Sequence, residues 1–243
     1  MFDSTIRGGI ELLTCRPLHE RGVAHGFTSR RNGFGARNNA REDHSLLARA
    51  LELDATAAMK QVHGCDVQSI TDAEPTLECD AVVTDRPGLG LIVHTADCVP
   101  MLVWAETVNA VSAVHAGWRG TLANVGKRAV ETLVTHKSAS PDELHVAIGP
   151  AVRACCFEVG DEVVAAFVAG GRDREVISRP GPQQRRHVDL VEDNRRQLLE
   201  AGVRGERIYD SGCCTVCENE RFYSYRREGK GVGRLMGVIA VKS

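Results

Sequence analysis

The chain of 243 residues has little that favours a membrane or an export signal. Its longest apolar stretch, 89–104, is interrupted by His94, Asp97 and Pro100. A membrane-spanning helix needs about 20 predominantly apolar residues. The start of the chain has no apolar segment of the kind found in secretory signals. We therefore expect a cytoplasmic protein with no membrane partner.

The chain also lacks an excess of charge of one sign. It has 30 Lys and Arg and 32 Asp and Glu, which gives a net charge of −2. A protein that neutralises phosphate backbones is strongly basic, so we expect no nucleic-acid partner.

The nine cysteines are an odd number in a chain long enough to build its own core, which argues against a disulfide framework. Cys214 and Cys217 form one Cys-x-x-Cys pair. Cys155-Cys156 does not supply the second such pair of a zinc ribbon, so we expect a structural role for the pair.

Several signatures of metal and nucleotide chemistry are missing. No two of the nine histidines are two residues apart, so the His-x-His pairs of multicopper oxidases and cupins cannot be assembled. The cytidine-deaminase signature His-x-Glu with Pro-Cys-x-x-Cys is absent. The chain also has neither a phosphate-binding Gly-x-x-x-x-Gly-Lys-Ser/Thr loop nor a Gly-x-Gly-x-x-Gly after a strand.

The patterns that are present predict a mixed fold. Short runs rich in Val and Ile predict strands at Ala81–Thr84, Leu91–Thr95, Val99–Trp104, Ala110–His115, Leu144–Ile148, Arg207–Tyr209 and Met236–Val241. Apolar residues at helical spacing predict helices at Arg41–Leu53, Thr121–Lys137, Asp161–Ala169 and Leu190–Ala201. Strands and helices do not alternate one to one. We therefore predict an α+β (mixed α/β) fold of mixed sheets flanked by helices, in a single domain spanning residues 1–243.

Three segments place a metal-ligand side chain at a strand end beside a tight turn. They contain His63, Cys98 and His115. A catalytic zinc site commonly uses three protein ligands and leaves a fourth position for water, and two imidazoles with one thiolate suit zinc. The residues alone leave a second interpretation open, in which the histidines end strands and Cys98 is a small buried apolar side chain.

Two basic segments are candidates for anion binding. The turn after His115 leads into the helix predicted at Thr121, whose free N–H groups would favour a phosphate, with Arg119 assisting. An ordinary strand–helix connection is the alternative. The glycine- and asparagine-containing stretch Ser29–Asn39 predicts a loop that carries Arg30.

Six ordered segments together point to one family. They are Gln61-Val62-His63-Gly64, Cys79–Asp85, Thr95–Pro100, Val114–Gly120, Ala147–Pro150 with Cys156–Gly160, and Phe222–Arg227. The chain resembles the bacterial laccase-domain, or polyphenol oxidase, family, whose members are often named multicopper oxidoreductases and are regarded as zinc-dependent purine nucleoside phosphorylases. The match covers most of the chain. One departure is Phe157, where the family usually has tyrosine.

The resemblance implies that His63, Cys98 and His115 hold Zn²⁺. It also implies phosphorolysis of adenosine, inosine, guanosine and methylthioadenosine, and deamination of adenosine. Copper(II) can compete for such ligands in vitro. The expected partners are a purine nucleoside and phosphate, and we expect a monomer.

The remaining site residues are assigned by their chemistry. Arg30 and Arg226, with Arg119, are expected to clamp phosphate, because a guanidinium binds it through two hydrogen bonds. Asp97, next to Cys98, is expected to act as an acid or base beside the catalytic Cys98, His63 and His115. A turn-capping role for Asp97 is the alternative.

Three other functions stay open. Cys98 could be the nucleophile and His115 the base of a cysteine hydrolase or amidase, including one that edits peptidoglycan precursors. The chain could also be a purine-binding module without enzymatic activity. A laccase or polyphenol oxidase is disfavoured because the His-x-His pairs are missing.

Overall fold

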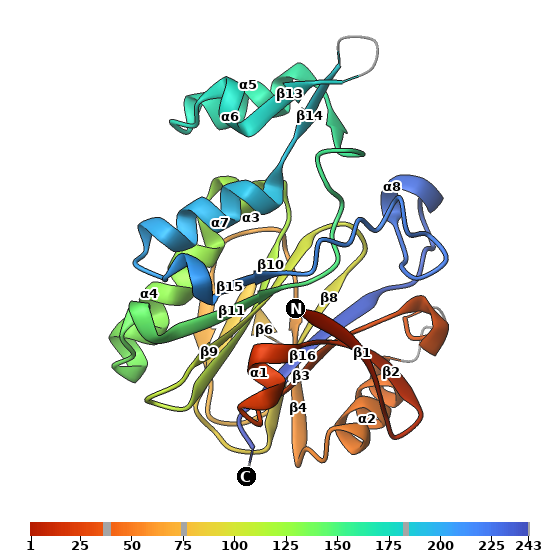
Figure 1. Ribbon diagram of the computed structural model, residues 1–243, viewed down its shortest axis with the longest axis vertical. Coiled ribbons are helices and arrows are strands. Elements are labelled where there is room, and N and C mark those ends of the chain that lie inside the picture. The colour runs from red at the N-terminus through yellow and green to blue at the C-terminus, as the bar shows by residue number, and fades with distance from the viewer. Residues whose placement is uncertain (36–39, 74–76, 182–184, 243) are drawn as a thin grey trace.

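Two large β-sheets face each other in the computed structural model, which describes residues 1–35, 40–73, 77–181 and 185–242 (Figure 1). Among these residues the larger sheet has seven strands in the order β1-β2-β3-β16-β8-β4-β6. Their bounds are Phe2–Arg7 (β1), Ile10–Cys15 (β2), Ala24–Thr28 (β3), Leu235–Ala240 (β16), Leu89–Thr95 (β8), Ala55–Lys60 (β4) and Leu77–Glu78 (β6).

The second sheet has six strands in the order β15-β11-β9-β10-β7-β5. Their bounds are Ile208–Asp210 (β15), Leu144–Ile148 (β11), Val99–Ala105 (β9), Ala110–Ala116 (β10), Ala81–Thr84 (β7) and Val67–Ser69 (β5). Antiparallel and parallel pairs occur in both sheets. The prediction of a mixed fold is confirmed, and the strands predicted between 81 and 148 agree with the observed ones to within two residues.

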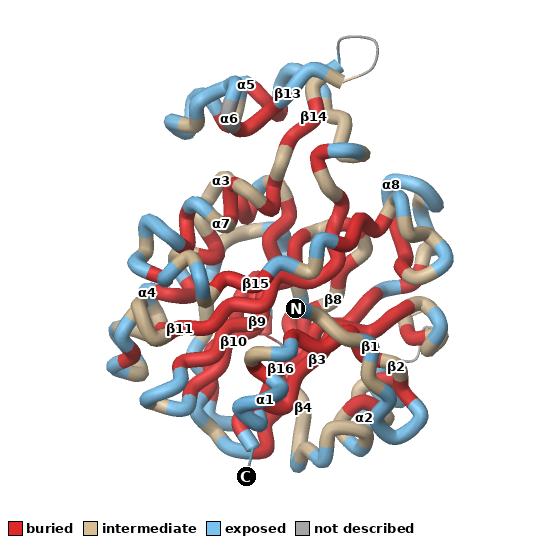
Figure 2. The backbone as a smooth tube through the Cα atoms, in the orientation of Figure 1, coloured by how far each residue is buried: buried red, intermediate tan, exposed pale blue. Residues whose placement is uncertain are grey.

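The central strands are apolar on both faces because both faces are covered. On β9, Leu102 faces Phe27 and Leu91 of the larger sheet, in the core between the sheets. Its neighbours Met101 and Val103 face the opposite way, toward helices, since successive side chains of a strand point to opposite faces. Figure 2 shows the resulting band of buried backbone through the centre of the molecule.

Helices cover the outer faces. Helices α3 (Trp118–Leu122), α4 (Val125–Lys137) and α7 (Leu190–Glu200) lie on the six-stranded sheet, and α2 (Ala40–Ala50) covers the larger one through Leu47. Shorter elements complete this body, namely α1 (Arg16–Glu20), α8 (Tyr225–Glu228) and the 3-10 turns Arg30–Asn32, Pro141–Glu143 and Gly205–Arg207. No helix in the described ranges is both long and apolar enough to cross a bilayer.

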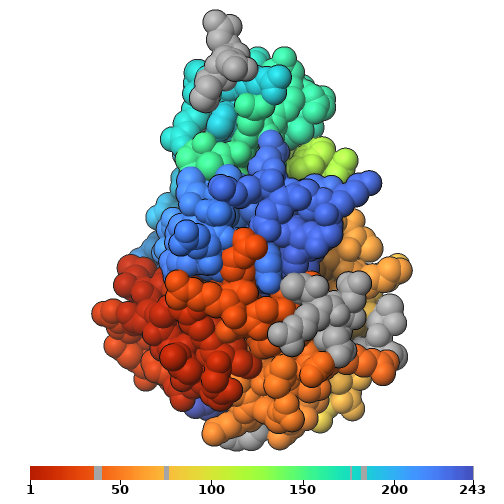
Figure 3. Space-filling view, turned by 90° about the vertical axis from the view of Figure 1, so that its right-hand side faces the viewer, coloured from red at the N-terminus to blue at the C-terminus, as the bar shows by residue number. Residues whose placement is uncertain are grey.

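A smaller unit stands at the top of the molecule in Figure 1. It contains a sheet in the order β12-β14-β13 and two helices. The bounds are Glu158–Val159 (β12), Asp161–Ala169 (α5), Arg174–Ile177 (α6), Ser178–Pro180 (β13) and Arg186–Val188 (β14). The chain enters this unit after β11 and returns directly into α7. Figure 3 shows the C-terminal part in blue between this unit and the N-terminal part.

The helix predicted at Thr121–Lys137 is confirmed from Val125 onward and wrong at its start. It is two helices, α3 and α4, separated at Asn124, which adopts a left-handed conformation with φ 62°. Asparagine tolerates this region better than most residues, and its side chain also accepts a hydrogen bond from Arg172. Thr121 is therefore buried inside α3 and caps no helix. The helix that follows the turn after His115 begins at Trp118, so the N-terminus expected to bind an anion lies three residues earlier than predicted.

The N-terminal segment contains structure that the sequence did not predict. The strands β1, β2 and β3 lie where only a mixed segment was recognised. Of the predicted loop Ser29–Asn39, residues Arg30–Asn32 form a 3-10 turn, and 36–39 lie outside the described residues.

We predict that Gly149→Ala destabilises the contact between the two sheets. A Cβ at this position would lie 2.4 Å from Cε1 of Phe27. Overpacking of this kind costs about 1–3 kcal/mol, so the urea midpoint falls. Combining the change with Phe27→Leu should recover part of the loss. Gly205→Ala is the matched control, because its new Cβ would meet nothing closer than 3.6 Å. An unchanged midpoint in Gly149→Ala would contradict this packing.

Candidate metal centre and its cavity

The fold brings His63, Cys98 and His115 together. His63 lies in the turn after β4, Cys98 precedes β9, and His115 is on β10. One ligand atom from each lies within 4.8 Å of the other two. The histidine rings meet edge to face, with centroids 4.9 Å apart. The sequence predicted that these three residues lie together, and the fold does bring them together.

A glycine makes this close approach possible. A Cβ at Gly117 would lie 3.0 Å from Cδ2 of His63 and 3.2 Å from Sγ of Cys98. Both separations are tighter than side-chain contacts normally allow. The turn after β10 therefore passes beside the cluster only because residue 117 has no side chain.

The buried carboxylate of Asp80 holds two of the three ligand segments. Its Oδ1 accepts hydrogen bonds from Nδ1 of His115 at 2.8 Å and from the main-chain N–H of His63 at 3.0 Å. Its Oδ2 accepts from the N–H of Gly64 at 2.6 Å and of Val62 at 3.3 Å. Burial alone would raise the pKa of this carboxyl, but the bonds to His115 and Gly64 outweigh burial and lower it. Asp80 is thus ionised and fixes the turn and the imidazole together.

Cys98 is held as a thiolate. Burial by itself would raise the pKa of its thiol, but hydrogen bonds from His115 and His63, and their charges, lower the pKa to about 6. The pKa of His115 moves the other way. Its burial opposes protonation, but Asp80 and Cys98 outweigh that effect and raise the pKa to about 9. Without a metal the pair is a thiolate and an imidazolium.

The donor set fits a zinc ion. A carboxylate only accepts hydrogen bonds, so Nδ1 of His115 carries the proton, and Nε2 remains as the ligand atom. A ligating histidine normally donates its other N–H to a carboxylate or carbonyl, which fixes its orientation. Two imidazole nitrogens and one thiolate are ligands typical of a catalytic zinc with an open position.

The cluster lies in a cavity of about 870 Å³. This volume is within the range of small-molecule sites. The described lining mixes apolar and aromatic side chains with three histidines, three arginines and one carboxylate, namely Met59, Gln61, His63, His94, Thr95, Ala96, Asp97, Cys98, His115, Trp118, Arg119, Val152, Phe157, Leu190, Tyr225, Arg226 and Arg234. The cavity therefore combines apolar and aromatic surface with polar groups and positive charge.

Two of the predicted arginines line this cavity. The guanidinium of Arg119 lies 4.3 Å from the ring centroid of Trp118, and that of Arg226 lies 5.3 Å from that of Phe157. Neither belongs to an ion pair within the described part of the chain. Both keep their charge available for an anion.

Arg30 lies elsewhere. It is not among the described lining residues of the cavity. Its guanidinium pairs with Glu228 at 3.1 Å and stacks on Tyr223 at 4.8 Å. Arg234, which the sequence analysis did not single out, lines the cavity instead.

Asp97 is tied to two segments. Its Oδ1 accepts from the hydroxyl of Thr215, and its Oδ2 accepts from the main-chain N–H of Arg226, both at 2.6 Å. The residue has a φ of 99°, which a non-glycine residue rarely adopts. These contacts connect the turn before Cys98 to the C-terminal wall of the cavity.

Sequence reasoning missed two positioning residues. Asp80 belongs to a recognised segment, and a buried acid inside an apolar strand run was the signal for its role. Gln61 was also missed. Its amide donates to the carbonyl of His94 at 2.7 Å and accepts from the N–H of His94 at 2.8 Å, fixing the segment before His63 against β8.

Comparison with known proteins places the chain in a family. Residues 24–242 match the family model described as "Multi-copper polyphenol oxidoreductase laccase". The chain belongs to this family. A family member from Deinococcus radiodurans named "Purine nucleoside phosphorylase" is 37% identical over 235 residues, with 90% of this chain and 89% of that protein covered. A member from an unknown prokaryotic organism named "Adenosine deaminase RL5" is 36% identical, with 76% and 74% covered.

The solved structures agree with the family assignment. The crystal structure of YlmD from Geobacillus stearothermophilus superposes with a TM-score of 0.89 at 30% identity, covering 100% of this chain and 99% of that one. The laccase-domain fold expected from the resemblance is therefore confirmed.

We predict that Cys98 of the metal-free protein reacts with iodoacetamide as a low-pKa thiol. Its labelling rate should rise through pH of about 6 and level off above pH 7, because the thiolate is then fully formed. Peptide-level mass spectrometry gives the rate. Cys15 is the internal control, because it is fully buried and its pKa is raised to about 12. A rate that keeps rising to pH 9 would contradict the thiolate–imidazolium pair.

Proposed function

We propose that the protein is a purine nucleoside phosphorylase that also deaminates adenosine, with residues 1–243 as one catalytic domain. The observation that carries the proposal is the convergence of His63, Cys98 and His115 in a cavity whose walls carry aromatic side chains and three arginines. The cavity volume suits a nucleoside with phosphate. The names of the relatives from Deinococcus radiodurans and the unknown prokaryote support the same two activities.

Different walls of the cavity would recognise the purine and the phosphate. Trp118, Phe157 and Tyr225 offer aromatic surface to a purine, and Met59 adds apolar surface. Arg119, Arg226 and Arg234 bind the phosphate, because a guanidinium can donate two parallel hydrogen bonds to a pair of phosphate oxygens. In phosphorolysis a phosphate oxygen forms a bond to C1′ of the ribose, and the bond from C1′ to the purine nitrogen breaks. The purine leaves with the electron pair and takes up a proton.

In this proposal His63, Cys98 and His115 would hold zinc, which when bound supplies Lewis acidity and a positive charge beside the substrates. Asp80 orients His115 and the turn that carries His63. Asp97 acts as a positioning residue, because each of its oxygens already accepts a hydrogen bond that fixes the cavity wall. Adenosine, inosine, guanosine and methylthioadenosine are the substrates to be tested.

The assay follows products from each nucleoside with and without phosphate. We predict free base and a ribose 1-phosphate that depend on phosphate, and inosine and ammonia from adenosine. Cys98→Ala should lower both activities at least 100-fold, because it removes a metal ligand. Cys65→Ala is the matched control, since Cys65 lies outside the described lining of this cavity. Full activity of metal-free Cys98→Ala would overturn the zinc assignment, and no base release by the zinc-loaded wild type would overturn the phosphorylase.

One observation favours a second candidate, a cysteine hydrolase or amidase. The Cys98 thiolate and the His115 imidazolium form the pair that such enzymes use as nucleophile and base. Chelation separates the two functions, because removing zinc abolishes the phosphorylase and frees the nucleophile. Hydrolysis of peptidoglycan precursors by the chelated protein, blocked by alkylation of Cys98, would support the hydrolase.

A further inference from the structure

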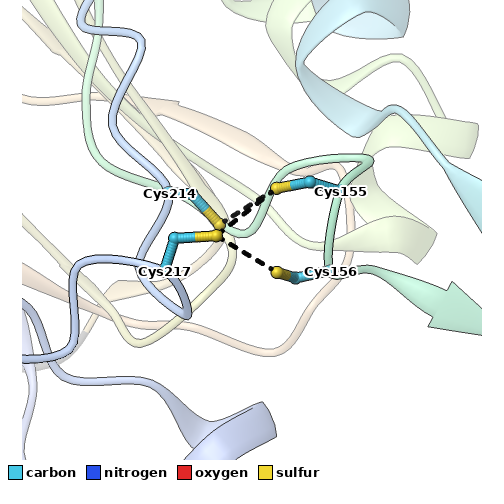
Figure 4. Close-up of side chains that lie close together, drawn as sticks. All are labelled: Cys155, Cys156, Cys214 and Cys217. Atoms are coloured by element: carbon cyan, nitrogen blue, oxygen red, sulfur yellow. Dashed lines mark hydrogen bonds between the residues drawn. The ribbon is translucent and has the colours of Figure 1, made fainter.

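Four cysteines form a second cluster, close to the Thr215 turn that contacts Asp97. Cys155 and Cys156 lie in the turn between β11 and β12, and Cys214 and Cys217 lie in the turn after β15 (Figure 4). Sγ of Cys155 is 3.6 Å from Sγ of Cys214 and 3.7 Å from that of Cys217, and Cys156 and Cys217 are 3.4 Å apart. All four sulfurs lie within 4.8 Å of one another. Cys155-Cys156 is not a second Cys-x-x-Cys pair, but the fold brings this turn and the Cys-x-x-Cys turn together.

The spacing of the sulfurs fits a metal better than disulfides. A disulfide requires a separation of about 2.05 Å, and the three measured separations are well above that. Zinc binds cysteine sulfur at about 2.3 Å in tetrahedral geometry, which places the sulfurs about 3.8 Å apart. The observed separations of 3.4–3.7 Å are close to this edge length.

The surroundings of the cluster suit a bound thiolate group. The main-chain N–H groups of Val216 and Cys217 face the sulfur of Cys214. Arg227 donates to the carbonyl of Val216 at 3.3 Å, and Arg153 donates to that of Cys213 at 3.1 Å. Arg153 is also paired with the carboxylate of Asp210. Arg227, which has no ion pair among the described residues, therefore offsets part of the net charge of −2 that four thiolates leave on a divalent ion.

We propose that Cys155, Cys156, Cys214 and Cys217 bind one structural zinc ion. A tetrahedral set of four thiolates is a closed site of the kind that holds zinc for folding and leaves no position for a substrate. Binding releases the thiol protons to solvent and forms four Zn–S bonds, with no change in oxidation state. The proposal is independent of the phosphorylase activity.

The zinc would join two segments that build the cavity. Cys156 precedes Phe157, which lines the cavity and starts the path into the upper unit. Thr215 lies between the other two cysteines and donates its hydroxyl to Asp97. The ion therefore fixes the wall that carries Phe157 relative to the turn before Cys98. Its role is positional, because none of the four cysteines is among the described lining residues.

Metal content in a Cys98→Ala background gives the first test, because that change disables the candidate catalytic site. Cys98→Ala should retain about one zinc per chain by elemental analysis, and Cys98→Ala/Cys217→Ser should lose it. Cys217 is exposed, so its replacement leaves the core intact. Cys98→Ala/Cys15→Ala is the matched control, which removes a cysteine outside the cluster and should keep the zinc.

Cobalt(II) gives a second readout that does not depend on activity. Added to metal-free Cys98→Ala, one equivalent should give the strong thiolate charge-transfer and tetrahedral d–d absorption of a four-sulfur site. Cys155→Ser, an exposed position, should weaken both in the same background. A protein without metal whose four thiols react freely would overturn the proposal. So would a mass lower by four hydrogens, which marks two disulfides, or bound iron in place of zinc.

Discussion

The hydrogen bonds to the buried carboxylate of Asp80 are the interaction on which the candidate metal centre depends. The carboxylate accepts from the imidazole of His115 and from three successive main-chain N–H groups of the turn that carries His63. A buried charge is stable only when it is fully paired. Removing any of these donors therefore leaves a buried carboxylate with too few hydrogen bonds and destabilises the turn and the imidazole that it holds. Two candidate ligand residues, one in the turn after β4 and one on β10, are thereby fixed by one acid.

The cavity forms where the larger sheet, the six-stranded sheet and the C-terminal turns meet. The larger sheet supplies His94 from β8, and the six-stranded sheet supplies His115. Both sheets have apolar residues on each face, so polar groups collect at strand ends, where the turns leave the core. Asp97 joins this edge to the turn of Thr215 and to the backbone of Arg226. The arrangement places His63, Cys98 and His115 in one cavity with the guanidinium groups of Arg119, Arg226 and Arg234.

The sequence was sufficient to predict strands β7 to β11 and the three clustered residues. Both signals are local, since apolar runs mark buried strands and His63, Cys98 and His115 lie close to strand ends. Asn124 broke a predicted helix because one left-handed residue interrupts an otherwise continuous apolar pattern. The four-cysteine cluster was missed because Cys155 and Cys214 are 59 residues apart and meet only through the pairing of β11 with β15. Arg234 was missed for the same kind of reason.

The zinc affinity of Asp80→Asn tests the account most directly. The measurement is a competition titration of metal-free protein in a Cys217→Ser background, so that only the site of His63, Cys98 and His115 contributes. The account predicts an affinity 10–100-fold lower than that of the background protein, as found when a carboxylate behind a ligating histidine is removed. Circular dichroism and a cooperative melt confirm that the variant is folded. A folded Asp80→Asn variant with unchanged zinc affinity would contradict the account.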